Sequence, residues 1–343
     1  MATASLADLL THPDWRLPAT VVGPDPFRRV ADAASYLPAS AIDGVILECR
    51  LRRGDSRVDL ALSIDRLAEA APAIDRVARE VAPARDRSTW ARIVELMRVW
   101  PDVFWFEFDL DVERVTELPL PSMFFRLPFE SVDGQKVLVA DAPAHAVEGL
   151  DRLLGTPLAP AVRTNVIACL TSAPPGVRIH QVGAMLPRGG GRVRLCFYAP
   201  SLETAAVFCD QHGCSAEWAA VHAVLAPLQF GPAMILVNFD VAEDVRRKVG
   251  IEVYPRAMPR DVAWRRLLEG LVEAGLCDPG KGADLPGWNG CSVNGAVAAH
   301  DGVNLLKREL RHVKIVAEPG MPLEAKVYLG LTVTPIRARQ AGN

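Results

Sequence analysis

The sequence lacks the features that would place the chain in a membrane, in the secretory route or on nucleic acid. No uninterrupted apolar run reaches the roughly 20 residues that a membrane-spanning helix needs. The opening residues, MATASLADLLTHPDW, hold no basic segment followed by an apolar one, so we expect no secretory signal. The formal net charge is −3, which gives no positive footprint for nucleic acid. We therefore predict a soluble protein whose partners include neither nucleic acid nor a membrane.

Closely spaced cysteine pairs of the C-x-x-C type are also missing. The seven cysteines include no C-x-x-C pair, which favours reduced thiols in a cytoplasmic protein. Cys209, His212 and Cys214 are close in sequence, but no second ligand cluster accompanies them, as zinc sites require. We predict neither a metal site nor another cofactor.

What the sequence does contain is a repeated pair of short alternating segments. Several of the connections hold Gly or Pro, which suits hairpin turns. The pairs lie at 44–52 and 57–65, 103–111 and 122–129, 177–186 and 192–198, 233–241 and 249–254, and 312–317 and 324–332.

Helical patterns separate these pairs. Half of the residues are apolar, so a chain of 343 residues can bury a sizeable core. The recurring unit is helix, helix, strand, strand, and we expect one domain over residues 1–343. Its five repeats run roughly over 27–65, 66–129, 142–198, 201–254 and 261–334.

Strand phase predicts what lies inside. In the last strand Val327 and Leu329 share one face, and Lys326 and Tyr328 share the other. Nearly every strand divides in this way, and amphipathic helices are available to cover the apolar faces. The polar faces then line a closed barrel or lie on an open, solvated sheet. Ten strands favour closure, because closure removes both exposed edges, and a barrel of that width can hold a ligand.

Five such units around a polar lumen resemble the ABBA-type aromatic prenyltransferases, and most of all their dimethylallyl-tryptophan synthase branch. The resemblance is architectural and covers residues 27 to 334. It implies an α+β fold, the PT barrel, with helices outside a ten-stranded antiparallel barrel. Glu48 and Arg57 stand where the family has its base and its first diphosphate-binding arginine, and Lys326 and Tyr328 match its Lys-x-Tyr form.

Four other positions depart from the family pattern. Cys196 replaces the tyrosine of an Arg-x-Lys-x-Tyr pattern, and Glu252 replaces the amide of Gln-x-Tyr. On the fourth strand Phe124 and Arg126 replace a lysine and a tyrosine. The resemblance implies a transferase that moves a prenyl group from an allylic diphosphate to an aromatic, indole-like or peptide acceptor in secondary metabolism. Because no D-D-x-x-D motif is present, we expect it to work without magnesium.

We predict Glu48 as the catalytic residue, since a carboxylate can take the proton of the acceptor ring. Basic side chains would bind the diphosphate, and aromatic faces would shield the allylic cation. The predicted substrate-binding residues are Arg57, Trp105, Glu107, Arg126, Arg192, Arg194, Glu252, Tyr254, Lys314, Lys326 and Tyr328.

The same residues permit a second reading. Acidic and basic side chains of the lumen nearly balance, so they could simply pair with one another. The chain would then be a PT-barrel enzyme or a binding protein for a peptide or secondary metabolite, with lumen carboxylates used for non-prenyl chemistry. A basic cluster around a phosphate-sized space favours prenyl transfer, whereas fully paired charges favour the alternative.

Overall fold

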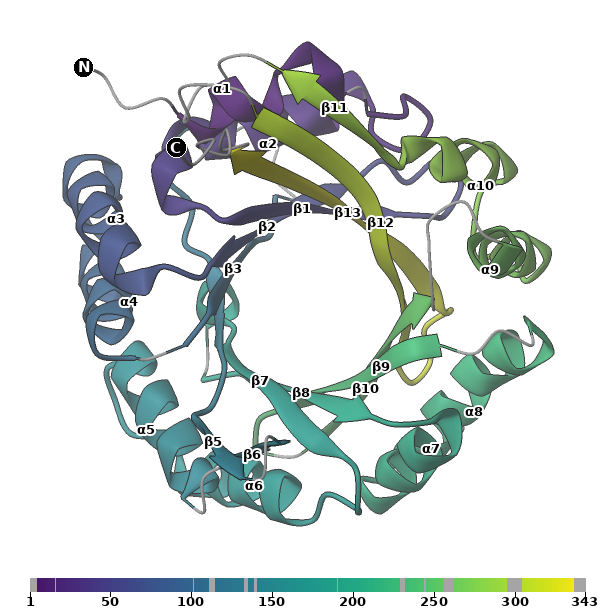
Figure 1. The fold of residues 1–343 in the computed structure, drawn as a ribbon. Helices are drawn as coiled ribbons and strands as arrows, with labels where there is room; N and C mark the ends of the chain where they lie inside the picture. The colour runs from purple at the N-terminus through teal and green to yellow at the C-terminus, as the bar shows by residue number, and fades with distance from the viewer. Residues whose placement is uncertain are drawn as a thin grey trace, which may run out of the picture.

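A closed ring of ten antiparallel strands forms the centre of the computed structural model (Figure 1). The strand order is β10-β9-β8-β7-β4-β3-β2-β1-β13-β12, and β10 pairs with β12, so the barrel has no free edge. This confirms the predicted α+β fold with a ten-stranded barrel. The structure describes residues 5–15, 17–100, 102–110, 115–132, 135–138, 141–189, 191–228, 232–243, 245–255, 262–294 and 304–335.

Each predicted hairpin supplies two neighbouring strands. The barrel strands are β1 (Gly44–Arg50), β2 (Val58–Ile64), β3 (Phe104–Phe108), β4 (Ser122–Phe125), β7 (Arg178–Ala184), β8 (Val193–Ala199), β9 (Pro232–Val241), β10 (Val245–Pro255), β12 (Asn304–Ala317) and β13 (Glu324–Pro335).

The helices form an outer ring around the barrel (Figure 1). None of those in the described ranges is both long and apolar enough to cross a bilayer. The α-helices are α1 (Leu6–Leu10), α2 (Pro24–Ser35), α3 (Leu67–Val81), α4 (Arg87–Val99), α5 (Ala142–Leu154), α6 (Pro160–Thr171), α7 (Leu202–Gln211), α8 (Ser215–Leu225), α9 (Val262–Glu273) and α10 (Pro279–Asp284). Short 3-10 turns are η1 (Pro13–Trp15), η2 (Ala39–Ala41), η3 (Leu186–Arg188), η4 (Ala226–Leu228) and η5 (Leu285–Trp288).

The hydrophobic core lies between the outer faces of the strands and the inner stripes of the helices. On α4, Trp90, Ile93 and Met97 follow the helical spacing and are at most 1% exposed. The Trp90 ring meets the edge of Phe106 on β3, with 6.0 Å between centroids. Burying one such side chain contributes about 1.5–3 kcal/mol. The apolar faces of the strands therefore pack against the helices, and the polar faces point into the barrel.

The last repeat contains more strand structure than its sequence pattern predicts. Strand β12 begins at Asn304, eight residues before the predicted start at 312. Its first part pairs with an additional strand, β11 (Gly290–Asn294), and its last part closes the barrel against β10. A second unpredicted hairpin joins β5 (Phe129–Val132) to β6 (Gln135–Leu138).

Register shifts interrupt the strand alternation on β7, β10 and β12, and those on β7 and β12 bear on the chamber. The pairing register shifts between Ile179 and Gln181 on β7, and between Leu310 and His312 on β12. Each shift inserts one extra residue, which resets the inward and outward alternation of the strand. The inserted residues, His180 and Arg311, both line the interior of the barrel.

Candidate active site

The barrel encloses a chamber with two connected halves. We call the half lined by Glu48, Arg50, Asp59, Asp240 and Lys326 the charged half; its cavity measures about 80 Å³. The other, the aromatic half, measures about 160 Å³. It is lined mainly by Trp105, Phe124, Arg126, His180, Tyr254, Arg311, His312 and Tyr328. Ala61, Glu107, Arg194, Asn238 and Lys314 line both halves.

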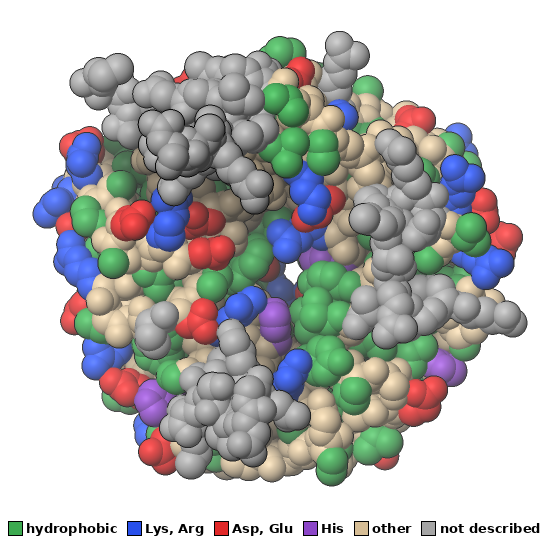
Figure 2. Space-filling model, viewed as in Figure 1, with side chains coloured by type: hydrophobic (Ala, Val, Ile, Leu, Met, Phe, Trp, Pro, Cys, Tyr) green, Lys and Arg blue, Asp and Glu red, His purple; other side chains and the backbone are tan. Residues whose placement is uncertain are grey.

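The chamber lining changes from aromatic to charged along the barrel axis, and the inward-pointing residues of a single strand show this change. On β9, Leu236 lines the aromatic half, Asn238 lines both halves, and Asp240 lines the charged half. The residues between them, Val237 and Phe239, are fully buried under the helices. Figure 2 shows a central opening at which basic, acidic, histidine and apolar side chains meet.

Ten of the twelve predicted site residues line this chamber, and Arg57 and Arg192 do not. Arg57 pairs with Asp55, with Nη2 2.6 Å from Oδ2, and lines a separate cavity at one end of the barrel. Arg192 lines a cavity that also touches Thr89 of α4 and Val162 of α6. Both arginines precede the first residue of their strands, so the alternation that orients the strand does not orient them.

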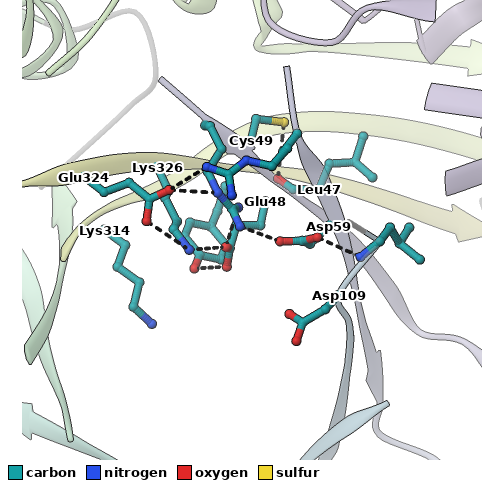
Figure 3. A network of polar contacts seen from close by, with 12 residues as sticks. Leu47, Glu48, Cys49, Asp59, Asp109, Lys314, Glu324 and Lys326 are labelled. Atoms are coloured by element: carbon teal, nitrogen blue, oxygen red, sulfur yellow. Dashed lines mark hydrogen bonds and ion pairs between the residues drawn. The ribbon is translucent and has the colours of Figure 1, made fainter. Parts of the chain in front are cut away.

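Glu48 is held by three donors from two strands (Figure 3). Lys326 Nζ lies 2.8 Å from Glu48 Oε1, and Arg50 Nη1 lies 2.7 Å from the same oxygen. The Tyr328 hydroxyl donates to the other carboxylate oxygen. Burial alone would raise the pKa of Glu48, but the charges of Lys326 and Arg50 hold this pKa well below its usual value. Glu48 is therefore an oriented, ionised carboxylate.

Arg50 extends the network across the charged half. Its Nη2 donates to Asp59 Oδ2 at 2.8 Å, and its Nε lies 3.0 Å from Glu324 Oε1. Figure 3 shows Glu48, Asp59, Glu324 and Lys326 gathered on this wall, with Lys314 extending into the open space nearby. We did not assign Arg50 to the site from the sequence, although it shares the strand phase of Glu48 two positions away.

A second carboxylate cluster centres on Glu252 of β10. Lys314 Nζ lies 3.0 Å from Glu252 Oε1, and Asn238 Nδ2 donates to the same oxygen at 3.1 Å. The Tyr254 hydroxyl donates to Glu252 Oε2 at 3.1 Å. Burial opposes ionisation, but Lys314 lowers the pKa of Glu252 to about 2. Gly250 leaves the space for Lys314, because a Cβ there would lie 2.6 Å from Lys314 Cε.

Stacked rings form one wall of the aromatic half. His312 lies between Tyr254 and Tyr328, with centroid distances of 4.3 and 3.9 Å. Burial lowers the pKa of His312 to about 4, so its ring is neutral at neutral pH. We did not assign His312 to the site from the sequence, although it shares the strand phase of Lys314 two positions away.

Glu107 differs from the other chamber carboxylates. Its carboxyl group has no hydrogen bond or ion pair within the part of the chain that the structure describes. Burial, reinforced by the nearby charge of Glu48, raises the pKa of Glu107 to about 7. Its carboxyl group is therefore about half protonated at neutral pH.

The basic side chains of the charged half are paired with acids. Besides the contacts above, Arg194 holds Asp240 in a two-pronged contact at 2.6 and 3.1 Å. Arg188 lies 3.0 Å from Asp109. Lys248, which also lines the charged half, lies 2.9 Å from Glu318. The arrangement is thus a compensated set of charges rather than an uncompensated basic cluster.

The cysteines near His212 sit among the outer helices, away from the chamber lining. Cys169 Sγ lies 3.8 Å from His212 Nδ1. Across the described ranges, no three His, Cys, Asp or Glu side chains are grouped so that they could hold a metal ion.

Comparisons with known proteins place this barrel among solved structures. No protein-family model and no curated protein sequence matches the chain. A 6-dimethylallyl tryptophan synthase matches with a TM-score of 0.54 and 18% identity, over 97% of this chain and 92% of that one. The 5-dimethylallyltryptophan synthase from Streptomyces coelicolor matches with a TM-score of 0.50 and 12% identity, over 96% and 98%.

The NotF prenyltransferase also matches, with a TM-score of 0.50 and 11% identity, over 84% of this chain and 80% of that one. At such identities the likeness concerns the fold. Its coverage agrees with the strand order and with the helices outside the barrel. The chain therefore has the PT-barrel fold of the ABBA-type aromatic prenyltransferases.

Proposed function

We propose that this protein is an aromatic prenyltransferase that joins a prenyl group from an allylic diphosphate to an aromatic acceptor. One observation carries the proposal. Within a PT barrel, the oriented carboxylate of Glu48 stands in a chamber that changes from charged to aromatic along its axis. Such a gradient suits a substrate with an anionic leaving group and an apolar prenyl chain. We place its activity in the cytoplasm and in secondary metabolism, with a free aromatic compound or a peptide as acceptor.

The diphosphate would bind at the junction of the two halves. Arg194 and Lys314 present cations there, and Lys326 adds one from the charged half. Charge-assisted hydrogen bonds from them would stabilise the charge that develops on the leaving oxygen. Each of these cations already holds a carboxylate. Donor binding therefore requires the cations to exchange or share these partners. The cationic side chains would also take the place of a magnesium ion.

The aromatic half would shield the allylic cation. Tyr254, Tyr328 and Trp105 line this space, and a ring face turned to the cation would contribute about 0.5–2 kcal/mol of cation–π attraction. The two tyrosine hydroxyls donate to Glu252 and Glu48, so their rings are fixed in place.

Proton removal completes the reaction. As the C–O bond breaks, its electron pair leaves with the diphosphate, and the acceptor ring supplies the pair for the new C–C bond. Loss of the ring proton to Glu48 then returns the C–H electron pair to the aromatic system. Lys326 and Tyr328 keep the Glu48 carboxylate oriented while it accepts that proton.

A second candidate function rests on the paired charges. Because the cations of the charged half are compensated by acids, the chamber also suits a ligand without a diphosphate. In that case the chain is a PT-barrel binding protein or an enzyme that acts by other chemistry on a peptide or secondary metabolite.

Calorimetry with a thiolo-diphosphate prenyl analogue separates these candidates. The wild type should bind the analogue, and Lys326→Ala should bind it more weakly because a diphosphate contact is lost. Glu48→Gln should bind it nearly as well as the wild type. With the reactive donor and an indole acceptor, Glu48→Gln should turn over roughly 10²–10⁴-fold more slowly.

Arg163→Gln is the matched control, since Arg163 is a half-exposed residue of the outer helix α6. It should resemble the wild type in both assays. If the wild type fails to bind the analogue at millimolar concentration, the prenyltransferase proposal is wrong and the second candidate takes its place.

A further inference from the structure

We propose that a cavity on the flank of the barrel binds a small organic acid, with a carboxylate head and an apolar body, at a site separate from the chamber. This flank cavity lies where α4, α5 and α6 follow one another in the outer ring, against the connection between β7 and β8 (Figure 1). Its volume is about 430 Å³, larger than either half of the chamber. Small-molecule sites measure roughly 300–1,000 Å³. The inference goes beyond the proposed function and does not depend on it.

Apolar side chains form much of the wall of the flank cavity. Leu158, Val162 and Met185 are at most 5% exposed, so this wall is the edge of the hydrophobic core rather than a solvated surface. Leu120, Leu154 and Leu186 are half-buried and complete it. Contact with such a wall removes hydrocarbon from water, so the wall suits the apolar body of a ligand.

Arg92 of α4 brings a cation to this wall. Its Nε donates to the Leu153 carbonyl oxygen at 3.0 Å, and its Nη2 donates to Thr89 Oγ1 at 2.9 Å. The side chain crosses Gly155, where a Cβ would lie 2.8 Å from Arg92 Nε. Glu95 is three residues further along the helix, but neither it nor another acid of the described residues forms an ion pair with Arg92. Neutral groups therefore orient this guanidinium without offsetting its charge.

Arg192 brings a second cation from the barrel side of the cavity. Its carbonyl oxygen accepts from Met185 N at 2.9 Å, which fixes the backbone at this position. Its side chain makes no hydrogen bond or ion pair with the residues that the structure describes. The N-terminus of α6 adds partial positive charge, because its N-cap, Ala159, lines the cavity and provides no side-chain cap. The charge of Arg192, which we predicted to serve the diphosphate, is thus available here.

The neighbouring acids are already engaged. Asp151 of α5 accepts from Leu158 N at 2.7 Å and lies 3.6 Å from Arg163. Glu117, which precedes Leu120 in the same loop, pairs with Arg85. Two guanidiniums beside an apolar wall match a single carboxylate, whereas a diphosphate carries more charge and requires more donors. The flank cavity therefore favours an organic acid.

Buried side chains separate the flank cavity from the chamber. Met185 lines the flank cavity and packs against Phe124, which lines the aromatic half. Both side chains are at most 2% exposed. Neither Arg92 nor Arg192 lines the chamber. A ligand of the flank cavity is therefore distinct from a substrate of the chamber, and the two can be bound together.

Calorimetry on the wild type with three probes tests the chemistry of the site. Octanoate has both the carboxylate and the apolar body, its neutral amide keeps the body alone, and acetate keeps the head alone. Octanoate should bind roughly tenfold or more tightly than the amide, because the amide loses the charge-assisted contact. Acetate should not bind measurably. Equal binding of octanoate and its amide, or no binding of octanoate at millimolar concentration, would overturn the inference.

Variants locate the bound octanoate. Arg92→Gln and Arg192→Gln should each weaken its binding roughly fivefold or more, since each removes one charged donor. Leu120→Trp should also weaken it, because the larger ring fills the cavity without changing a charge. Arg98→Gln is the matched control, because Arg98 is an exposed residue of the same helix as Arg92 and pairs with Asp75. Thermal unfolding checks that each variant remains folded, and wild-type affinity in all three folded cavity variants would contradict the location.

The thiolo-diphosphate analogue and Lys326→Ala distinguish this site from the chamber. Octanoate should bind to Lys326→Ala as it does to the wild type, and the analogue should bind to Arg92→Gln as it does to the wild type. If Lys326→Ala abolishes octanoate binding and Arg92→Gln does not, the acid binds in the chamber and the inference is wrong. If Arg92→Gln weakens the analogue, the flank cavity binds a diphosphate and the organic-acid assignment is wrong. Failure of the wild type to bind the analogue ends the proposed function, whereas octanoate binding that depends on Arg92 still supports this inference.

Discussion

At the scale of single residues, the chamber holds two kinds of carboxylate. Glu48 and Glu252 are surrounded by donors and remain ionised far below neutral pH. Glu107, without a partner in the described residues, gains a proton near pH 7. The difference comes from contacts rather than from burial, since burial pushes the pKa of all three upward. A side chain that changes charge near neutral pH, at the junction of the two halves, makes the chamber sensitive to pH.

Glu107→Gln tests this difference through stability. The pKa of Glu107 is about 7 in the folded protein and about 4.5 when unfolded, so the folded state binds more protons between these values. Glu107 therefore lowers the free energy of unfolding as pH rises from about 4.5 to about 7.

Glu107→Gln should match the wild type in stability near pH 4.5. Above pH 7 it should be more stable, by on the order of 1–3 kcal/mol. Urea unfolding at both pH values measures this, with Glu95→Gln on the exposed face of α4 as the control. A stability difference that does not change with pH would contradict the assignment.

At the scale of elements, a short helix fixes the charged wall. Lys281 of α10 is 5% exposed, and its Nζ donates to the backbone oxygens of Arg50, Arg52 and Asp55. Asp278 caps the helix by accepting from Gly280 N at 2.8 Å. The helix thereby ties the end of β1 to a segment about 230 residues further along the chain. This contact sets the position from which Arg50 reaches Glu48 and Asp59.

Lys281→Met should destabilise the protein markedly. The methionine fills a similar volume but leaves three backbone oxygens without their donor, which costs roughly 3–5 kcal/mol. Urea unfolding should show the loss, whereas Lys307→Met, at a half-exposed lysine of β12, should change stability little. Equal effects of the two variants would show that Lys281 is not a structural tie.

At the scale of the whole molecule, closure of the barrel brings distant charges into one space. Lys326 and Glu48 are 278 positions apart and form an ion pair across β1 and β13. The wall then gathers cations from several repeats around one space. Under the proposed function, we expect a diphosphate bound there to need no metal to offset its charge.

Magnesium removal tests this charge arrangement. Because Arg194, Lys314 and Lys326 supply the positive charge, EDTA should change the affinity for the thiolo-diphosphate analogue less than about twofold. The same calorimetric titration with added magnesium provides the comparison. Binding that depends strongly on magnesium would show that the cations do not suffice, and would favour a metal-bound donor.

Local pattern alone predicted much of this architecture. Alternation in the ten segments identified the strands and the faces that the helices cover, because side chains of a strand point to opposite sides regardless of its neighbours. Ten of the twelve candidate residues chosen from this alternation line the chamber. Their roles in binding and catalysis stay predictions, as does the single domain over the whole chain.

Tertiary structure decided which of these residues meet and how they are charged. Pairing of β1 with β13 brought Lys326 and Tyr328 to Glu48, whereas burial and the charge of Glu48 raised the pKa of Glu107. Bulges on β7 and β12 turned His180 and Arg311 inward against the simple alternation. Alternation is a property of one strand, whereas register, bulges and charge compensation depend on strands that are distant in sequence. Only the closed barrel brings those strands together.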